Sequence, residues 1–270
     1  IERKGNVHIY DLEKGKDSVI ITMDVFSGLE DGLLGLAVDP KYKENNWIYL
    51  YYSENKNIDQ QNLSRFELKN DILDLASEKI LLHVATQRKE CCHSAGSIEF
   101  GPDGNLYLST GDNTSPRADG YAPIDNRKDR YPWDAQKSAG NTNDLRGKIL
   151  RIKPEADGTY TIPEGNLFAK GEAKTRPEIY VMGNRNPYRI SVDSRTGFLY
   201  WGEVGPDGNN DSLNLGPKGY DEINQAQRAG NFGWPYFVAN NQAYNARDYV
   251  ANTSGVKYDS LKPINESPNN

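Results

Sequence analysis

Three copies of one short unit run along this chain of 270 residues, and they constrain its fold more than any other feature. Each copy has an apolar residue, a turn built on Asp with Pro or Gly, and a strand rich in aromatic and apolar residues. The copies are Ala37–Pro40 followed by Trp47–Tyr52, Ile98–Gly104 followed by Leu106–Thr110, and Ile190–Gly197 followed by Phe198–Gly202. Such a hairpin cannot bury both faces alone, and radial stacking of its sheet leaves only short edges. The sequence therefore predicts an all-β chain with β-propeller architecture, and a β-sandwich or jelly roll is the alternative.

Partner strands and long loops are expected between the copies. The partner strands are Leu63–Leu68, Lys148–Ile152 and Glu178–Met182. The two longest insertions, Asp112–Leu145 and Pro206–Gly219, are rich in Asn, Asp, Gly and Pro, and each follows a repeated strand. Loops of this length are usually functional or disordered. A short helix or helical turn is expected at Asp221–Ala229, ended by Gly230.

Composition and missing motifs exclude several classes of function. No run of about 18 apolar residues occurs, so no membrane span is predicted. The formal net charge is -6, without a basic stripe, which argues against nucleic acid as a partner. The chain has no nucleophile elbow, P-loop, zinc-protease motif or Gly-rich dinucleotide fingerprint, which disfavours a Rossmann-type nicotinamide dehydrogenase. With only three His, a dedicated multi-His metal site is not expected.

The two cysteines of the chain, Cys91 and Cys92, are adjacent, so they cannot link distant parts of the fold. Neighbouring Cα atoms lie roughly 3.8 Å apart, below the usual range for a disulfide. A vicinal disulfide in a distorted turn and two reduced thiols remain as alternatives. The pair directly precedes His93.

His93 and Arg185 are the strongest candidates for chemistry. His93 lies among small residues that leave an imidazole accessible, so it can serve as a general base or be a hydrogen-bonded turn residue. Arg185 lies between two Asn before a Pro, in Val181–Tyr188 (VMGNRNPY). Its guanidinium offers a planar set of donors to carboxylates or quinone oxygens, or it braces loop carbonyls.

Oxygen donors gather in two later segments, Trp201–Asp207 (WGEVGPD) and Tyr220–Asn224 (YDEIN). Carboxylates, Asn side chains and turn carbonyls suit Ca²⁺, although acidic loops are more often merely solvated. Near the start, Glu30 and Asp31 lie at a loop tip before a buried strand. Neither carboxylate has a sequence-adjacent partner that would define a glycosidase pair, although one could form in space.

Together these segments resemble the soluble quinoprotein glucose/sorbosone dehydrogenase family, whose members are six-bladed propellers that oxidise sugars with pyrroloquinoline quinone and Ca²⁺. The segments occur in the order found in the family. They are Gly32–Pro40 (GLLGLAVDP), His93–Asp112, Arg146–Glu155 (RGKILRIKPE), Gly183–Tyr188 (GNRNPY), Gly202–Asp207 (GEVGPD), Asp221–Asn224 (DEIN) and Gly230–Pro235 (GNFGWP). The resemblance implies that residues 1–270 form one partial propeller domain, shortened at both ends, from a periplasmic or secreted protein.

The resemblance also implies roles for matching residues at the reaction centre. His93 matches the general base that takes the proton from the sugar hydroxyl. Arg185 matches a catalytic residue that contacts the quinone, and Asn186 is its neighbour in that contact. Glu30 matches a polar residue near the sugar. The implied reaction is hydride transfer from the sugar carbon to the quinone, with Ca²⁺ and Arg185 stabilising the charge that develops.

The metal residues are implied in the same way. Gly205 and Pro206 match the turn whose carbonyls bind the cofactor Ca²⁺, and Asp221 and Glu222 match a stretch associated with a second, structural Ca²⁺. The implied partners are a small sugar and a cytochrome c or other electron acceptor.

The chain departs from the family at several positions. Cys92 stands where an acidic residue orienting the base is expected, and Val204 replaces a polar residue. The family's basic residues that hold the cofactor carboxylates would lie beyond Asn270. These departures motivate an alternative function, a non-catalytic propeller that binds a carbohydrate or a protein. A hydrolase or lyase would need a carboxylate pair or a His–carboxylate pair near the central channel.

Overall fold

The described part of the chain is built almost wholly of short antiparallel strands. A computed structural model describes residues 1–56, 58–116 and 122–270. The first sheet is a meander in chain order of β3 (Leu33–Val38), β4 (Trp47–Ser53), β5 (Gln60–Lys69) and β6 (Ile72–Ala85), with the short α1 (Tyr42–Asn45) between β3 and β4. This sheet contains the first copy of the repeated unit.

The second and third sheets contain the other two copies. The second sheet pairs β7 (Ala95–Phe100), β8 (Leu106–Thr110), β9 (Lys148–Pro154) and β11 (Ile179–Met182), with β10 (Tyr160–Thr161) beside β9 and β15 (Gly230–Asn231) parallel to β11. The third sheet pairs β12 (Pro187–Val192), β13 (Leu199–Glu203) and β14 (Glu222–Ala226). All three predicted partner strands are therefore confirmed.

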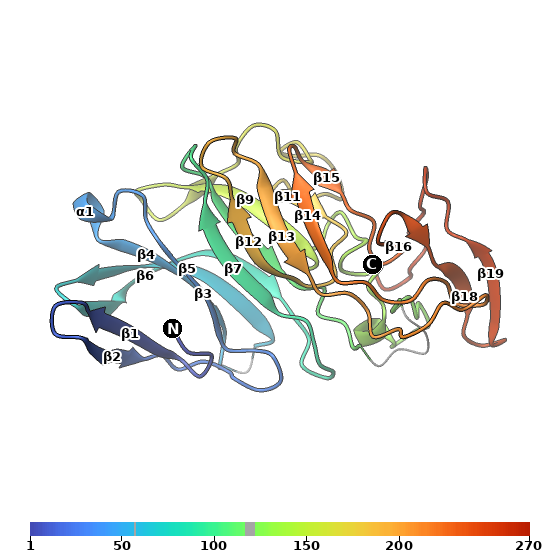
Figure 1. Cartoon of the computed structure of the whole chain (residues 1–270), viewed down its shortest axis with the longest axis horizontal. Helices are drawn as coiled ribbons and strands as arrows, with labels where there is room; N and C mark the ends of the chain where they lie inside the picture. The colour runs from blue at the N-terminus through green and yellow to red at the C-terminus, as the bar shows by residue number, and fades with distance from the viewer. Residues whose placement is uncertain (57, 117–121) are drawn as a thin grey trace.

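The remaining elements lie at the two ends of this row of sheets (Figure 1). Three hairpins pair β1 (Asn6–Asp11) with β2 (Lys16–Thr22), β16 (Phe237–Val238) with β17 (Gln242–Ala243), and β18 (Asn245–Asp248) with β19 (Thr253–Lys257). A single turn of 3₁₀ helix, Tyr131–Trp133, lies in the first long insertion. Among the described residues, no helix is long and apolar enough to cross a membrane.

In each copy of the repeated unit, the turn Asp accepts a hydrogen bond from the backbone N–H two residues later. The carboxylate of Asp39 accepts a hydrogen bond from the backbone N–H of Lys41, at 2.8 Å. Asp103 accepts the corresponding bond from Asn105, at 3.1 Å. Asp193 accepts the bond from Arg195, also at 3.1 Å. An Asp that bonds the backbone two residues on is a standard way to fix a turn, so the sequence repeat is a structural repeat.

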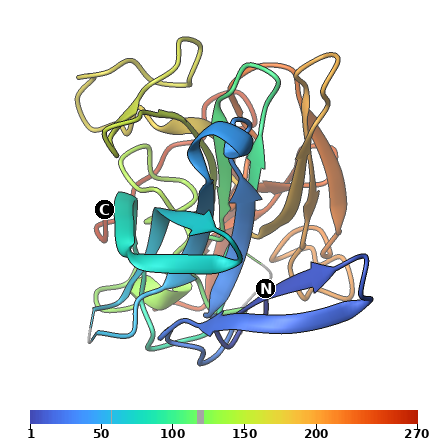
Figure 2. The same ribbon diagram turned by 90° about the vertical axis from the view of Figure 1, so that its left-hand side faces the viewer.

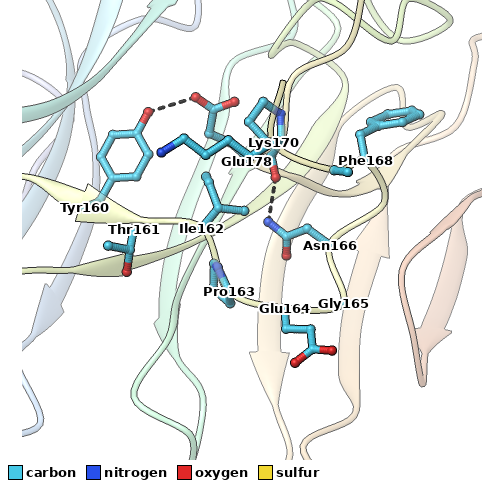
Figure 3. Close-up of a pocket in the computed structure, with 12 residues that line it drawn as sticks. Tyr160, Thr161, Ile162, Pro163, Glu164, Gly165, Asn166, Phe168, Lys170 and Glu178 are labelled. Carbon is cyan, nitrogen blue, oxygen red and sulfur yellow. Dashed lines mark hydrogen bonds between the residues drawn. The ribbon is translucent and has the colours of Figure 1, made fainter. Parts of the chain in front are cut away.

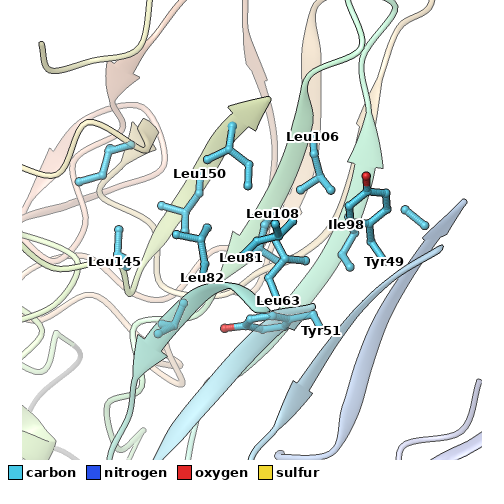
Figure 4. Close-up of a cluster of buried hydrophobic side chains, with 14 of the residues drawn as sticks. Tyr49, Tyr51, Leu63, Leu81, Leu82, Ile98, Leu106, Leu108, Leu145 and Leu150 are labelled. Carbon is cyan, nitrogen blue, oxygen red and sulfur yellow. The ribbon is translucent and has the colours of Figure 1, made fainter. Parts of the chain in front are cut away.

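Two apolar layers hold the three sheets together. Figure 4 shows the layer between the first and second sheets, where Tyr49, Tyr51 and Leu63 face Leu106, Leu108 and other buried side chains. A second layer, including Tyr107, Val181 and Trp201, lies between the second and third sheets. Hydrophobic burial on both faces of a sheet is what a radial stack requires.

The first strands of the three sheets come together at one edge of the row. β7 contacts both β3 and β12. The approach of β3 to β7 is close: a Cβ on Gly35 would lie 2.0 Å from the carbonyl oxygen of Gly96, so only glycine fits there. On the far side of the first sheet the β1–β2 hairpin, dark blue in Figure 2, covers the apolar residues Ile48, Leu50 and Phe66.

The predicted helix at Asp221–Ala229 is wrong. Residues Glu222–Ala226 form β14, which pairs antiparallel with β13 along its whole length. The edge of the third sheet offers these residues ladder hydrogen bonds and buries Ala226 in its core. Tertiary pairing of this kind overrides local helix propensity.

Candidate functional site

Nearly all the predicted site residues lie at one end of the sheets. Glu30 precedes β3, His93 precedes β7, and the pair Arg185–Asn186 precedes β12. The Gly205–Pro206 turn follows β13, whose end pairs with the start of β12. The fold thus gathers segments from three sheets, opposite the end that carries the Asp turns.

His93 is held by a residue that the sequence interpretation did not identify. Its ring is buried, and Nδ1 lies 2.8 Å from Oδ1 of Asp112, at the end of β8. No described residue forms a hydrogen bond with Nε2. A carboxylate on Nδ1 fixes the tautomer and orientation of an imidazole, and leaves Nε2 to exchange a proton. Asp112, and not the residue at position 92, therefore orients the His93 imidazole, which corrects the expectation that Cys92 stands in place of the orienting acid.

Asp112 is itself fully buried and held by three further bonds. Its Oδ2 accepts the indole N–H of Trp234 at 2.8 Å, and its Oδ1 accepts the N–H of Thr114 at 3.0 Å. Its own N–H donates to the carbonyl of Arg185 at 2.8 Å. Burial acts to raise the pKa of Asp112, but the charge of His93 and its hydrogen bond hold that pKa below the usual value. The carboxylate is thus kept charged beside the imidazole.

Arg185 and Asn186 are fixed through Glu203, at the end of β13. One carboxylate oxygen of Glu203 accepts both backbone N–H groups, at 2.8 Å and 2.6 Å. The Arg185 guanidinium is buried, donates to the carbonyl of Val204 at 3.0 Å, and lies 3.9 Å from the carboxylate of Asp207. The bond to Val204 shows the bracing role that the sequence left open. The guanidinium forms no other hydrogen bond with the described residues.

Glu203 has the most strongly shifted carboxyl group of the site. Burial raises its pKa to about 8, against the lowering effect of the bonds from Asn186, Trp201 and Arg185. The indole of Trp201 donates to the second oxygen at 3.0 Å. Glu222 adds negative charge nearby. A cation between the two carboxyl groups would favour their charged forms.

A small cavity of about 20 Å³ brings together most of the predicted metal residues. Gly205, Pro206 and Glu222 line it, together with Asn184 and Glu203. The Asn184 side chain is buried, and neither its oxygen nor its nitrogen has a hydrogen-bond partner among the described residues. The cavity therefore presents several oxygen atoms of the kind that Ca²⁺ prefers.

Asp221 does not line this cavity. Its carboxylate instead accepts the N–H of Gly205 at 2.9 Å, so it braces the Gly205–Pro206 turn. A Cβ on Gly205 would lie 1.9 Å from the carbonyl oxygen of Tyr220, which requires glycine at this position. Asp221 thus contacts the turn by a hydrogen bond, whereas Glu222 lines the cavity next to it.

A larger cavity of about 550 Å³ opens at Ser94, the residue after His93; His93 itself does not line it. Glu30, Ser94 and Asn186 supply polar groups to its wall, and Leu29, Val204 and other side chains supply apolar ones. The carboxylate of Glu30 accepts the N–H of Ser94 at 3.2 Å, which ties the loop before β3 to the residue after His93. The volume suits a small polar molecule with one apolar face.

The adjacent cysteines form a vicinal disulfide, which settles the alternative left open by the sequence. Cys91 is partly exposed, and Cys92 is 9% exposed. The carboxylate of Glu30 and the two sulfur atoms all lie within 4.8 Å of one another. The disulfide therefore directly precedes His93 in the sequence and lies close to the carboxylate of Glu30.

A further cavity of about 720 Å³ lies away from these residues, beside β10 (Figure 3). Its one buried carboxylate, Glu178, is fully engaged by Tyr160 at 2.8 Å and by Arg176 at 3.0 Å. Asn166 is used to bond the carbonyl of Pro177. None of the predicted site residues lines this cavity, and we assign it no chemistry.

Comparisons with known proteins agree with this geometry. The family model described as Glucose / Sorbosone dehydrogenase matches residues 1–264. Quinoprotein glucose dehydrogenase B of Acinetobacter calcoaceticus is 29% identical over 213 residues, covering 76% of this chain and 40% of that protein. Human Hedgehog-interacting protein is 28% identical over 190 residues, covering 64% of this chain and 24% of that protein.

A solved structure shows the same fold. The soluble aldose sugar dehydrogenase of Escherichia coli, in its apo form, superposes with a TM-score of 0.65 at 25% identity, covering 87% of this chain and 58% of that one. The predicted all-β propeller architecture is confirmed, and the chain spans less than half the length of the curated relatives named here. The chain belongs to the glucose/sorbosone dehydrogenase family.

Proposed function

We propose that the protein containing this chain oxidises an aldose sugar, with pyrroloquinoline quinone and Ca²⁺ as cofactors and His93 as the general base. The observation that carries the proposal is the buried His93–Asp112 pair, whose neighbour in sequence, Ser94, lines a cavity of about 550 Å³ together with Asn186. This pair alone would also suit a hydrolase or lyase, but membership of the glucose/sorbosone dehydrogenase family favours sugar oxidation. A periplasmic or secreted location and a cytochrome c or similar acceptor belong to the same proposal.

The residues present fit both cofactors. The Asn186 side-chain oxygen is buried without a hydrogen-bond partner among the described residues. In the neighbouring residue, the buried Arg185 guanidinium lies 3.9 Å from the carboxylate of Asp207. Because this distance is too long for a hydrogen bond, the guanidinium charge is available to a quinone oxygen. Gly205, Pro206 and Glu222 would hold Ca²⁺ with oxygen atoms around the small cavity.

The chain's own residues then have defined tasks. His93 accepts the proton of the sugar hydroxyl at Nε2, while Asp112 keeps the other nitrogen protonated and the ring fixed. Glu30, on the wall of the larger cavity, accepts hydrogen bonds from other sugar hydroxyls. When bound, the quinone and Ca²⁺ supply the hydride acceptor and stabilise its developing charge.

The test uses the full-length protein reconstituted with quinone and Ca²⁺ and assayed for dye reduction with a panel of aldoses. We expect His93→Ala to lower kcat by about 10²–10⁴-fold, the usual contribution of a positioned base, while quinone binding measured by calorimetry is unchanged. His83→Ala, an exposed histidine on β6, is the matched control and should retain activity. Full activity in His93→Ala, or no aldose oxidation by the native protein, would refute the proposal.

A second candidate is a propeller that binds a carbohydrate or protein without chemistry. Val204, an apolar residue on the wall of the larger cavity, supports it, because a polar residue was expected there. The resemblance to a protein named for an interaction, Hedgehog-interacting protein, supports it as well. Calorimetry that shows sugar binding with no quinone binding would favour this candidate.

A further inference from the structure

The vicinal disulfide and Glu30 form a chemical group that the proposed reaction does not use. Two sulfur atoms and a carboxylate oxygen lie within 4.8 Å of one another. Cys91 is partly exposed, so a small thiol can reach it from solvent. Among the described residues, Glu30 accepts one hydrogen bond, from the N–H of Ser94.

We propose that Cys91, Cys92 and Glu30 form a redox-controlled binding site for a thiophilic divalent cation of the Zn²⁺ or Cd²⁺ class. In the oxidised state the site is closed, because the sulfur atoms are bonded to each other and carry no charge to bind a metal. In the reduced state the same atoms offer two thiolates and a carboxylate, a ligand set that Zn²⁺ accepts and Ca²⁺ does not.

The charge balance makes the reduced site dependent on its cation. A neutral disulfide lies beside the carboxylate of Glu30 without electrostatic penalty. Two thiolates in its place would put three negative charges within 4.8 Å of one another, which is unfavourable unless a cation lies between them. Metal binding therefore stabilises the deprotonated thiols and releases their protons.

The opening step is an ordinary exchange with a small dithiol as reductant. One thiolate of the dithiol attacks the more exposed sulfur, that of Cys91, and Cys92 leaves as a thiolate. The second thiol of the reductant then displaces Cys91, so two electrons pass to the cysteines and the reductant leaves as a cyclic disulfide. A divalent cation replaces the two thiol protons.

The position of this site gives it a consequence for the larger cavity. Glu30 lines that cavity, and its carboxylate is bonded to the residue that follows His93. A cation held by Glu30 would take the carboxylate away from a bound sugar. Zn²⁺ should therefore inhibit sugar oxidation only after the Cys91–Cys92 disulfide has been reduced. The proposal of a cation site does not itself depend on whether the protein oxidises sugars.

The test titrates Cd²⁺ into the chain before and after reduction with a phosphine, which is removed under argon. We expect the reduced chain to bind one Cd²⁺ with a sulfur-to-metal charge-transfer band, and the oxidised chain to show no such band. Two protons should be released per cation near neutral pH. Zn²⁺ should displace the Cd²⁺, and Ca²⁺ should not.

The variants separate this site from adventitious thiol binding. Cys91→Ser should abolish the charge-transfer band, and Glu30→Gln should weaken Cd²⁺ binding at least tenfold while both thiols remain titratable. Glu90→Gln, next to the pair in sequence but outside the group, is the matched control and should bind like the native chain. Equal affinity in Glu30→Gln, no binding by the reduced chain, or unfolding on reduction as seen by circular dichroism would each overturn the proposal.

Discussion

His93 Nδ1 lies 2.8 Å from Asp112 Oδ1, and the same carboxylate accepts the indole N–H of Trp234, so one buried group links the second sheet to the segment that follows β15. The bond to His93 leaves Nε2 available for the proposed proton transfer. The bond to Trp234 fixes the carboxylate from its other side.

Asp112→Asn should lower kcat of the full-length protein by about 10²–10⁴-fold with little change in KM, because an amide no longer guarantees the proton on Nδ1. Steady-state kinetics measure the loss. Nitrogen NMR of the imidazole should show a changed tautomer, which a merely structural role would not produce. A variant with native kcat would contradict the orienting role of Asp112.

Glu203→Gln should flatten the dependence of stability on pH. Burial raises the pKa of Glu203 to about 8, above its unfolded value, so the folded state binds the extra proton. This contribution is fully present below the unfolded pKa and is lost as pH rises toward 8, at up to ~1.4 kcal/mol per pH unit. Urea unfolding of the chain between pH 5 and 9 measures the slope. Glu13→Gln, at an exposed position, is the control. A slope in Glu203→Gln equal to that of the native chain would contradict the raised pKa of Glu203.

Lys148→Met should destabilise the chain by at least ~2 kcal/mol, since unpaired buried groups cost about 1–3 kcal/mol each. The ammonium group is fully buried and donates to the carbonyls of Ser138, Ala139 and Arg146 at 2.7–3.1 Å. Methionine fills the volume but leaves the carbonyls of Ala139 and Arg146 without a donor, while that of Ser138 keeps the N–H of Asn141 at 3.0 Å. Thermal unfolding followed by circular dichroism checks the value. The exposed Lys170→Met should change stability little.

Gly35→Ala should destabilise the chain by about 1–3 kcal/mol, the range for overpacking a close contact. The added methyl group would lie 2.0 Å from the carbonyl oxygen of Gly96, so β3 and β7 must move apart. Denaturant titration measures the change. Gly104→Ala is a useful contrast, because its Cβ would meet no atom within 4 Å and only its positive φ opposes the change. Native stability in Gly35→Ala would show that the strands adjust.

The repeats predicted the sheets well because each sheet is local in sequence. The three turn Asp residues and the alternating strands carry that information within short windows. Glu222–Ala226 was assigned wrongly, because its strand conformation depends on pairing with β13, a contact that no local pattern shows.

The site was predicted in part for the same reason. His93, Arg185 and Asn186 are recognisable from their neighbours in sequence. Asp112 was missed as the partner of His93 because the two residues lie 19 positions apart in the sequence. Trp234 was missed as the second partner of Asp112 because those two residues lie 122 positions apart. The one available signal was the Gly-Asp pair that ends the second repeated strand, on the side where the site forms.

The long separation between Asp112 and Trp234 also orders events during synthesis. A chain made from its N-terminus can complete the first sheet once β6 has emerged, whereas the second sheet receives β15 only after the third sheet has been made. The carboxylate that orients His93 receives its indole donor only after residue 234 is made. The set of bonds that holds the His93–Asp112 pair is therefore completed only after the strands of all three sheets have been made, by a segment that belongs to none of these sheets.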